Sequence, residues 1–149
     1  MNKSILRALI FVIISSISSI CLSNEIIEYH NEYKGLIVTK STLTDAISVL
    51  GNPVKMGQVS KTVRYRFKGV DITAYSDTGL INSIIIYDKL YVDDNGISVG
   101  NNFDSVKQLP EIKILTTTIF DPKNGIVYWF NENRVTKIVL VGRAQSLIK

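Results

Sequence analysis

The chain has 149 residues, 46% of them hydrophobic, and a formal net charge of +4. Removing the predicted leader, residues 1–23, takes away Lys3 and Arg7 and leaves 15 basic against 13 acidic residues, a net of +2. So small an excess does not indicate nucleic-acid binding, which depends on basic residues gathered on one face. The remaining 126 residues (149 minus 23) are enough for one hydrophobic core.

Residues 1–23 have the order of a secretory signal peptide: a positive start, the apolar run 8–14 and the small-x-small site Cys21-Leu22-Ser23. The sequence therefore predicts cleavage near Ser23 and a periplasmic or secreted protein. Two alternatives stay open. One is an uncleaved membrane anchor, which would need about 20 apolar residues, more than the run 8–14 supplies. The other is a lipid on Cys21, which would bring membrane contact, although the preceding Ile20 is bulky where lipoprotein sites have a small residue. Cys21 is the only cysteine, so the exported chain has no disulfide and depends on its core.

Residues 24–34 are polar and alternating, which predicts an N-terminal arm or edge strand. Residues 35–90 are predicted to form a first helix-sheet unit. Thr42 and Asp45 have the side chains of a capping box, and the helix after them carries an apolar stripe at helical spacing. Gly51-Asn52-Pro53 ends it.

After this helix the period becomes two. Arg64, Arg66 and Lys68 alternate with apolar residues, which predicts a strand. A two-residue turn at Lys68-Gly69 would pair Arg66 with Asp71 and Arg64 with Thr73. The following run, 80–87, is apolar at both parities, so the sequence assigns it no buried face; a central strand or a bulge would explain it.

Residues 91–149 are predicted to form a second helix-sheet unit. Asn102 is the expected cap of its helix, and strands are expected at 112–120, 126–130 and 135–141. The hairpin 74–87 matches 128–141 without a gap, which places Trp129 at the position of Tyr75. The predicted fold class is therefore α+β, with two tandem units, each a short helix packed on a three- to four-stranded antiparallel sheet. The sequence leaves open whether the two sheets join into one with an open face.

Three motifs carry a family resemblance: Leu50-Gly51-Asn52-Pro53, Tyr65-Arg66-Phe67 and Asp77-Thr78-Gly79-Leu80-Ile81. A unit with these motifs resembles the helix-plus-sheet repeat of β-lactamase inhibitor proteins and of the outer-membrane assembly lipoproteins called BamE or SmpA/OmlA. The resemblance covers about residues 35–142 and implies a binding role in the exported compartment. It transfers no functional residue. The inhibitor proteins are disulfide-bonded, whereas the lipoproteins carry one such unit behind a lipidated cysteine, so this chain departs from both.

The sequence predicts no enzyme, catalytic residue, cofactor or metal site. His30 lies between Glu28 and Glu32, but same-face neighbours on one strand are about 6 to 7 Å apart, too far to close on one ion. If Gly96 of the turn 93–96 were the sixth residue of a calcium loop, Tyr91 would be first and Asn102 twelfth, where carboxylates are required, so the match fails. No Gly-x-Ser-x-Gly turn or glycine-rich phosphate loop is present.

The sheet face away from the helices is the predicted binding surface. Arg64, Arg66, Tyr75 and Trp129 are the candidate partner-binding residues, because arginine and large aromatics dominate binding hot spots. The alternatives are a solvated strand face for the arginines and a core position for Trp129. The predicted function is a non-enzymatic exported (periplasmic) protein-binding module, such as an inhibitor or the immunity protein of a toxin, whose partner is another protein in the periplasm or envelope. The alternative is a cell-envelope structural accessory protein similar to the assembly lipoproteins.

Overall fold

The computed structural model describes residues 26–29 and 31–145. The predicted signal peptide, the question of lipid at Cys21 and the environment of His30 lie outside the described residues. Within the described part, no helix is both long enough and apolar enough to cross a membrane.

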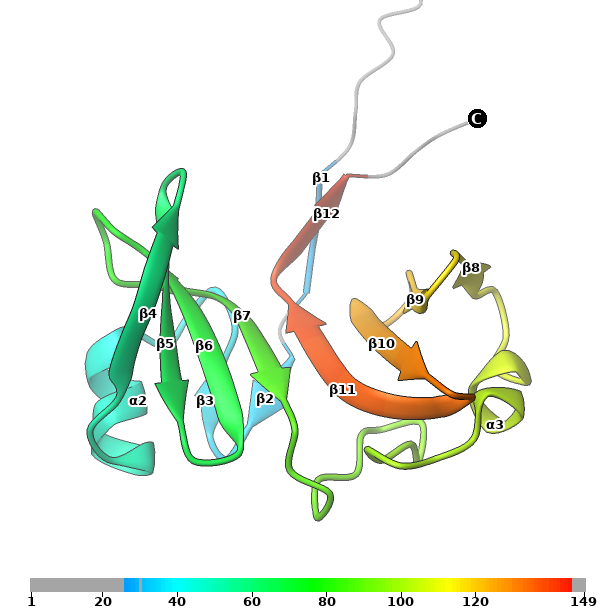
Figure 1. The fold of residues 1–149 in the computed structure, drawn as a ribbon. Coiled ribbons are helices and arrows are strands. Elements are labelled where there is room, and N and C mark those ends of the chain that lie inside the picture. Colours follow the sequence, from blue (N-terminus) through cyan, green and yellow to red (C-terminus); the bar gives the residue numbers. More distant parts are fainter. Residues whose placement is uncertain (1–25, 30, 146–149) are drawn as a thin grey trace, which may run out of the picture.

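One antiparallel sheet of eight strands organises the described chain (Figure 1). Its spatial order is β4-β5-β6-β7-β11-β10-β9-β8. The strands, in chain order, are β4 (Val54–Val59), β5 (Thr62–Phe67), β6 (Val70–Tyr75), β7 (Ile81–Ile86), β8 (Lys113–Ile114), β9 (Thr118–Asp121), β10 (Ile126–Asn131) and β11 (Arg134–Val141). Each half of the sheet is thus a four-stranded meander, and the last strands of the two meanders pair with each other.

The predicted α+β fold of two tandem helix-plus-sheet units is wrong. The chain is mostly β, with helices of only 8 residues (α2, Leu43–Leu50) and 5 residues (α3, Phe103–Lys107) among the described residues. β7 pairs with β11 through Ile85↔Val139, so the two meanders form one sheet. The apolar run of β7 is explained by this pairing, because a central strand has no free edge and contributes to both faces.

Two small sheets flank the large one. β2 (Glu32–Tyr33) pairs with β3 (Leu36–Ile37), and β1 (Ile26–Glu28) pairs with β12 (Arg143–Gln145). In Figure 1 the β1-β12 ribbon extends away from the middle of the large sheet. The described ends of the chain therefore lie side by side.

The hydrophobic core lies on one face of the sheet. Ala46 of α2 and Val106 of α3 are completely buried in the same cluster as Ile72, Ile84 and Ile138 of the central strands. Both helices therefore cover the same side. The remaining fully buried side chains of large volume are Tyr33, Leu36, Val38, Val70, Ile81, Ile86, Ile119, Tyr128 and Leu140.

The helix ends differ in how well the sequence predicts them. The capping box at Thr42 is confirmed: its hydroxyl accepts from the Asp45 backbone N–H, and Asp45 Oδ2 accepts from the Thr42 N–H at 2.7 Å. Asn102 is the N-cap of α3 but makes no capping hydrogen bond with its side chain.

The strand expected over 112–120 is divided into β8 and β9 by a turn, in which the Leu115 N–H donates to the Thr118 carbonyl at 2.8 Å.

The predicted β5-β6 register is confirmed, with Arg66 opposite Asp71 and Arg64 opposite Thr73. The gapless match between the hairpins 74–87 and 128–141 does not hold for the first strand of each hairpin, because their pairing registers differ. Thr73 pairs with Ser83, whereas Trp129 pairs with Lys137, the residue that corresponds to Ser83. Trp129 therefore occupies the position of Thr73 and not that of Tyr75, because seven residues separate Trp129 from its partner Lys137 whereas nine separate Thr73 from Ser83.

Candidate functional site

The face of the sheet opposite the core, here called the open face, carries one row of paired residues that crosses all eight strands. No described helix covers this face. The row follows directly from the register: each residue lies opposite the next on the neighbouring strand. From β4 to β8 its members are Val54, Arg66, Asp71, Ile85, Val139, Val127, Phe120 and Lys113.

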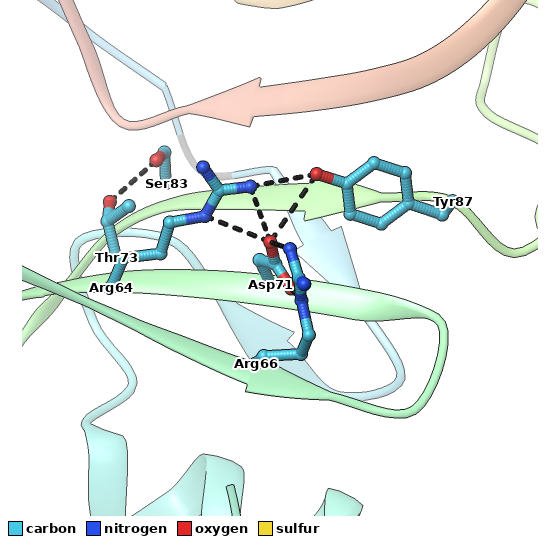
Figure 2. A network of polar contacts seen from close by, with 6 residues as sticks. All are labelled: Arg64, Arg66, Asp71, Thr73, Ser83 and Tyr87. Carbon is cyan, nitrogen blue, oxygen red and sulfur yellow. Dashed lines mark hydrogen bonds and ion pairs between the residues drawn. The ribbon is translucent and has the colours of Figure 1, made fainter. Parts of the chain in front are cut away.

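Asp71 is the centre of an ordered polar cluster on this face (Figure 2). Its carboxylate is 1% exposed. Arg64 donates to Oδ2 through Nε at 2.9 Å and through Nη2, while Arg66 donates through Nε to Oδ1 at 3.0 Å and through Nη2 to Oδ2 at 3.1 Å. The same Nη2 of Arg64 also donates to the hydroxyl of Tyr87 at 2.8 Å. One buried carboxylate thus fixes two guanidinium groups from the adjacent strand.

Local backbone geometry produces this arrangement. The turn at Lys68-Gly69 needs a left-handed residue, and Gly69 supplies it with φ +77°. The short turn fixes the register, so Arg66 lies directly opposite Asp71 and Arg64, two residues away on the same strand face, lies opposite Thr73. Arg66 thus meets the carboxylate across the strand pair, and Arg64 reaches it diagonally.

The electrostatics of the cluster favour a charged carboxylate and a neutral phenol. Burial raises the pKa of Asp71, but hydrogen bonds from Arg66 and Arg64 outweigh it and the net pKa is below its ordinary value. Burial, followed by the charge of Asp71, raises the pKa of Tyr87. A carboxylate so stabilised is a poor base, so the arrangement is suited to holding two cations in place and not to proton transfer.

The cluster leaves hydrogen-bond donors available. Within the described residues, Arg64 and Arg66 direct Nε and Nη2 at Asp71 and Tyr87, and the Nη1 group of each arginine has no hydrogen-bond acceptor. The two side chains are 39% and 51% exposed. An external carboxylate can therefore reach guanidinium groups that are already ordered.

Trp129 lies on the same face in the other half of the sheet. It is 39% exposed, and the Nζ atom of Lys137 lies 4.0 Å from the centroid of its ring. Burial, with a smaller contribution from the charge of Arg64, lowers the pKa of Lys137. Lys137 thus contacts the tryptophan and lies near enough to Arg64 for the charge of that guanidinium to lower its pKa.

An apolar strip runs from the edge of the Asp71 cluster across the second half of the open face. Ile85, Val139, Val127 and Phe120 are consecutive members of the row that crosses the sheet, and all four are half-buried. The open face therefore combines an ordered cationic cluster, a central apolar strip and an exposed tryptophan. This composition is typical of protein-binding surfaces.

The four residues predicted from the sequence all lie on the open face, but not in one cluster. Arg64 and Arg66 share Asp71, whereas Tyr75 pairs with Thr62 nearer the end of its strand. Trp129 is three strands from Asp71, or about 14 Å at ~4.8 Å per strand. The alternative in which Trp129 belongs to the core is wrong.

Sequence reasoning missed three contributors to this face: the burial of Asp71, the hydroxyl of Tyr87 and the ammonium of Lys137. The bulge at Asn82 explains the second omission, because it changes the parity within β7. Lys137 could have been found, since a shorter hairpin loop makes it the residue opposite Trp129 on the neighbouring strand.

A second polar cluster lies on the core side of the sheet. The hydroxyl of Tyr128 donates to Asp93 and accepts from Asn95 Nδ2 at 2.9 Å, and the same amide donates to Asp121 at 2.9 Å. Burial raises the pKa of Asp93, although the hydrogen bond from Tyr128 opposes this. Both acids cap neighbouring turns, with Asp93 accepting from the N–H of Ile97 at 2.8 Å, so the cluster has a structural role.

An open cleft of about 480 Å³ lies beside this cluster and is lined by Asn31, Glu32, Tyr91, Val92, Asp94 and Ile126. Within the described residues, no group of three His, Cys, Asp or Glu side chains is placed to hold a metal ion.

The fold and the site define a mostly antiparallel β protein whose uncovered sheet face carries an ordered cationic cluster. Comparisons with protein families, curated proteins and solved structures found no match to the chain.

Proposed function

We propose that this chain is a non-enzymatic, exported protein-binding module that binds the acidic surface of another protein of the periplasm or envelope. In this proposal it acts as an inhibitor or as an immunity protein. The observation that carries the proposal is the pair of half-exposed arginines, Arg64 and Arg66, held in place by the buried Asp71. Ordering the cations before binding lowers the entropic cost of forming the complex.

The size of the open face supports a protein partner. Seven spacings of about 4.8 Å give a width of ~34 Å, and strands of six residues are ~20 Å long. Their product is about 700 Å², close to the ~800 Å² that each partner contributes to a standard interface.

The charge of the face supports an acidic partner. Arg64, Arg66, Lys137 and Lys113 lie on it together with the carboxylate of Asp71, and these five described residues carry a net charge of +3 (four minus one). Electrostatic complementarity of this kind accelerates association and is weakened by salt. Association should therefore slow as ionic strength rises.

The proposal is tested by capturing partners from periplasmic extract on immobilised protein, at low and at high salt. Arg66→Glu reverses a charge on the open face, whereas Lys107→Glu makes the same change on an exposed residue of α3, on the covered side. A protein retained by the parent and by Lys107→Glu, but lost with Arg66→Glu, is the expected result. Equal recovery with both variants would contradict the proposal, and so would the absence of any captured protein.

Export is tested separately by sequencing the N-terminus of protein recovered from the periplasm, where Asn24 is the expected first residue. Incorporation of a labelled fatty acid at Cys21 would instead favour the envelope accessory role.

A further inference from the structure

The two edges of the large sheet are unequal. The edge strand β8 has only 2 residues, a length that offers little backbone for pairing. The opposite edge strand, β4, has 6 residues, and every one of them is exposed. Among the described residues only β5 pairs with the backbone of β4, so one edge is protected by its shortness and the other is open.

The side chains of β4 are apolar where an additional strand would continue the open face. Val54 and Val59 lie on that face opposite Arg66 and Thr62, and Val59 is 78% exposed. Exposed apolar residues on an unprotected edge are the feature that natural sheets usually avoid. A bulge at Met56 interrupts the ladder with β5, so an added strand is expected to pair in two stretches, Val54–Lys55 and Gly57–Val59.

The charge around this edge selects the kind of segment that fits. Between Val54 and Phe67 the chain carries four basic residues and no acidic one. Arg64 and Arg66 are paired with Asp71 on the open face, whereas Lys55 and Lys61, on and next to β4, have no acidic partner among the described residues. Pairing β4 with β4 of a second copy would bring these like charges together, which is unfavourable. An extended segment with acidic side chains would instead be attracted.

We propose that β4 accepts an extended segment of a partner protein, in which apolar residues alternate with acidic ones, as a ninth strand of the sheet. Backbone hydrogen bonds to the free edge supply affinity, and the alternating side chains supply specificity. Apolar side chains of the added strand lie beside Val59 on the open face, while its acidic side chains lie on the side of Lys55. The backbone edge and the two lysines used here are distinct from the arginines that carry the function proposed above, so either proposal can fail without the other.

The probe is a short fluorescent peptide in which valine alternates with glutamate, titrated with the full mature chain and followed by anisotropy. Two further peptides of the same sequence carry N-methyl groups on alternate residues, one set on each edge of the extended peptide. Methylation of the edge that faces β4 removes the hydrogen bonds without changing any side chain. Saturable binding of the parent peptide, abolished by one methylation pattern and retained with the other, is the expected result.

The charge requirement is tested with the double variant Lys55→Glu/Lys61→Glu. Its matched control is Lys89→Glu/Lys107→Glu, which has the same net charge and changes exposed residues away from β4. Affinity should fall at least about tenfold in the first variant, equivalent to ~1.4 kcal/mol, and stay within about twofold in the control. Circular dichroism of both variants verifies that they fold.

Three outcomes would overturn the proposal. The first is no saturable binding of the parent peptide, and the second is equal binding of both methylated peptides. The third is a dimer, seen by analytical ultracentrifugation, that the Lys55→Glu/Lys61→Glu variant alters, because this result assigns the edge to a second copy of the chain.

Discussion

Replacing Asp71 by asparagine tests whether the buried carboxylate organises the open face. The substitution keeps the shape of the side chain but leaves Arg64 and Arg66 without their shared anion. Removing one partner of a buried ion pair costs about 3–5 kcal/mol. Because both arginines are roughly half-exposed, water compensates part of this loss, and we expect about 2 kcal/mol.

The assay is urea unfolding followed by far-ultraviolet circular dichroism, with Asp104→Asn as the control. Asp104 is exposed on the first turn of α3, so its substitution removes the same charge without a buried partner and should cost a few tenths of a kcal/mol at most. A loss of about 2 kcal/mol lowers the melting temperature by roughly 6–10 °C in a chain of this length.

The dependence on pH gives an independent check. The pKa of Asp71 is lowered in the folded state, so its stabilising contribution is present above the unfolded pKa of about 3.9 and is lost as the pH falls through the folded value. The difference between the parent and Asp71→Asn should therefore be constant from pH 7 to about pH 5 and should shrink below about pH 4. A difference under ~0.5 kcal/mol at pH 7, or one that grows on acidification, would refute the reasoning.

Two matched pairs of substitutions probe the packing, each by urea unfolding. Gly142→Ala places a methyl group 2.4 Å from the nearest side-chain atom and should lower the free energy of unfolding by about 1–3 kcal/mol. The added methyl group of Gly57→Ala meets nothing within 4 Å, so this control should cost under ~0.5 kcal/mol. Similar costs for the two substitutions would contradict the packing around Gly142. Tyr128→Phe removes a hydroxyl that donates to Asp93 and should cost about 1.5–3 kcal/mol. Tyr33→Phe removes a buried hydroxyl that has no hydrogen-bond partner among the described residues, so it should leave stability unchanged or raise it. A loss with Tyr33→Phe equal to that with Tyr128→Phe would show that the hydrogen bond to Asp93 is not the source of the effect.

Local features of this fold were predictable because they depend on adjacent residues. The Thr42 capping box and the pairing of Arg66 with Asp71 each follow from a few side chains and one short turn. The joining of the two meanders was not predictable, because it depends on β7 and β11, which are separated by about 50 residues of sequence. Both strands are apolar, and neither sequence specifies which other strand it pairs with.

In the candidate site, too, the sequence predicted the local arrangement of residues but not the contacts made between strands. Periodicity placed Arg64, Arg66 and Tyr75 on one strand face, and the hairpin match added Trp129 with the wrong register; all four lie on the open face. Periodicity could not show that Asp71 is buried, since an acidic residue in an alternating strand is usually solvated. Its burial results from the two arginines of β5 that cover it, together with Tyr87, which follows the end of β7.

The pairing of β7 with β11 has a consequence for how the chain is made. β7 is complete by residue 86, but its second neighbour begins only at Arg134, so a nascent chain carries the run Ile81–Ile86 with one side unpaired for nearly fifty further residues of synthesis. An apolar strand in that condition invites association with other unfinished chains. Fragments that stop before Arg134 should therefore aggregate, and a holding chaperone should protect them until the last long strand arrives.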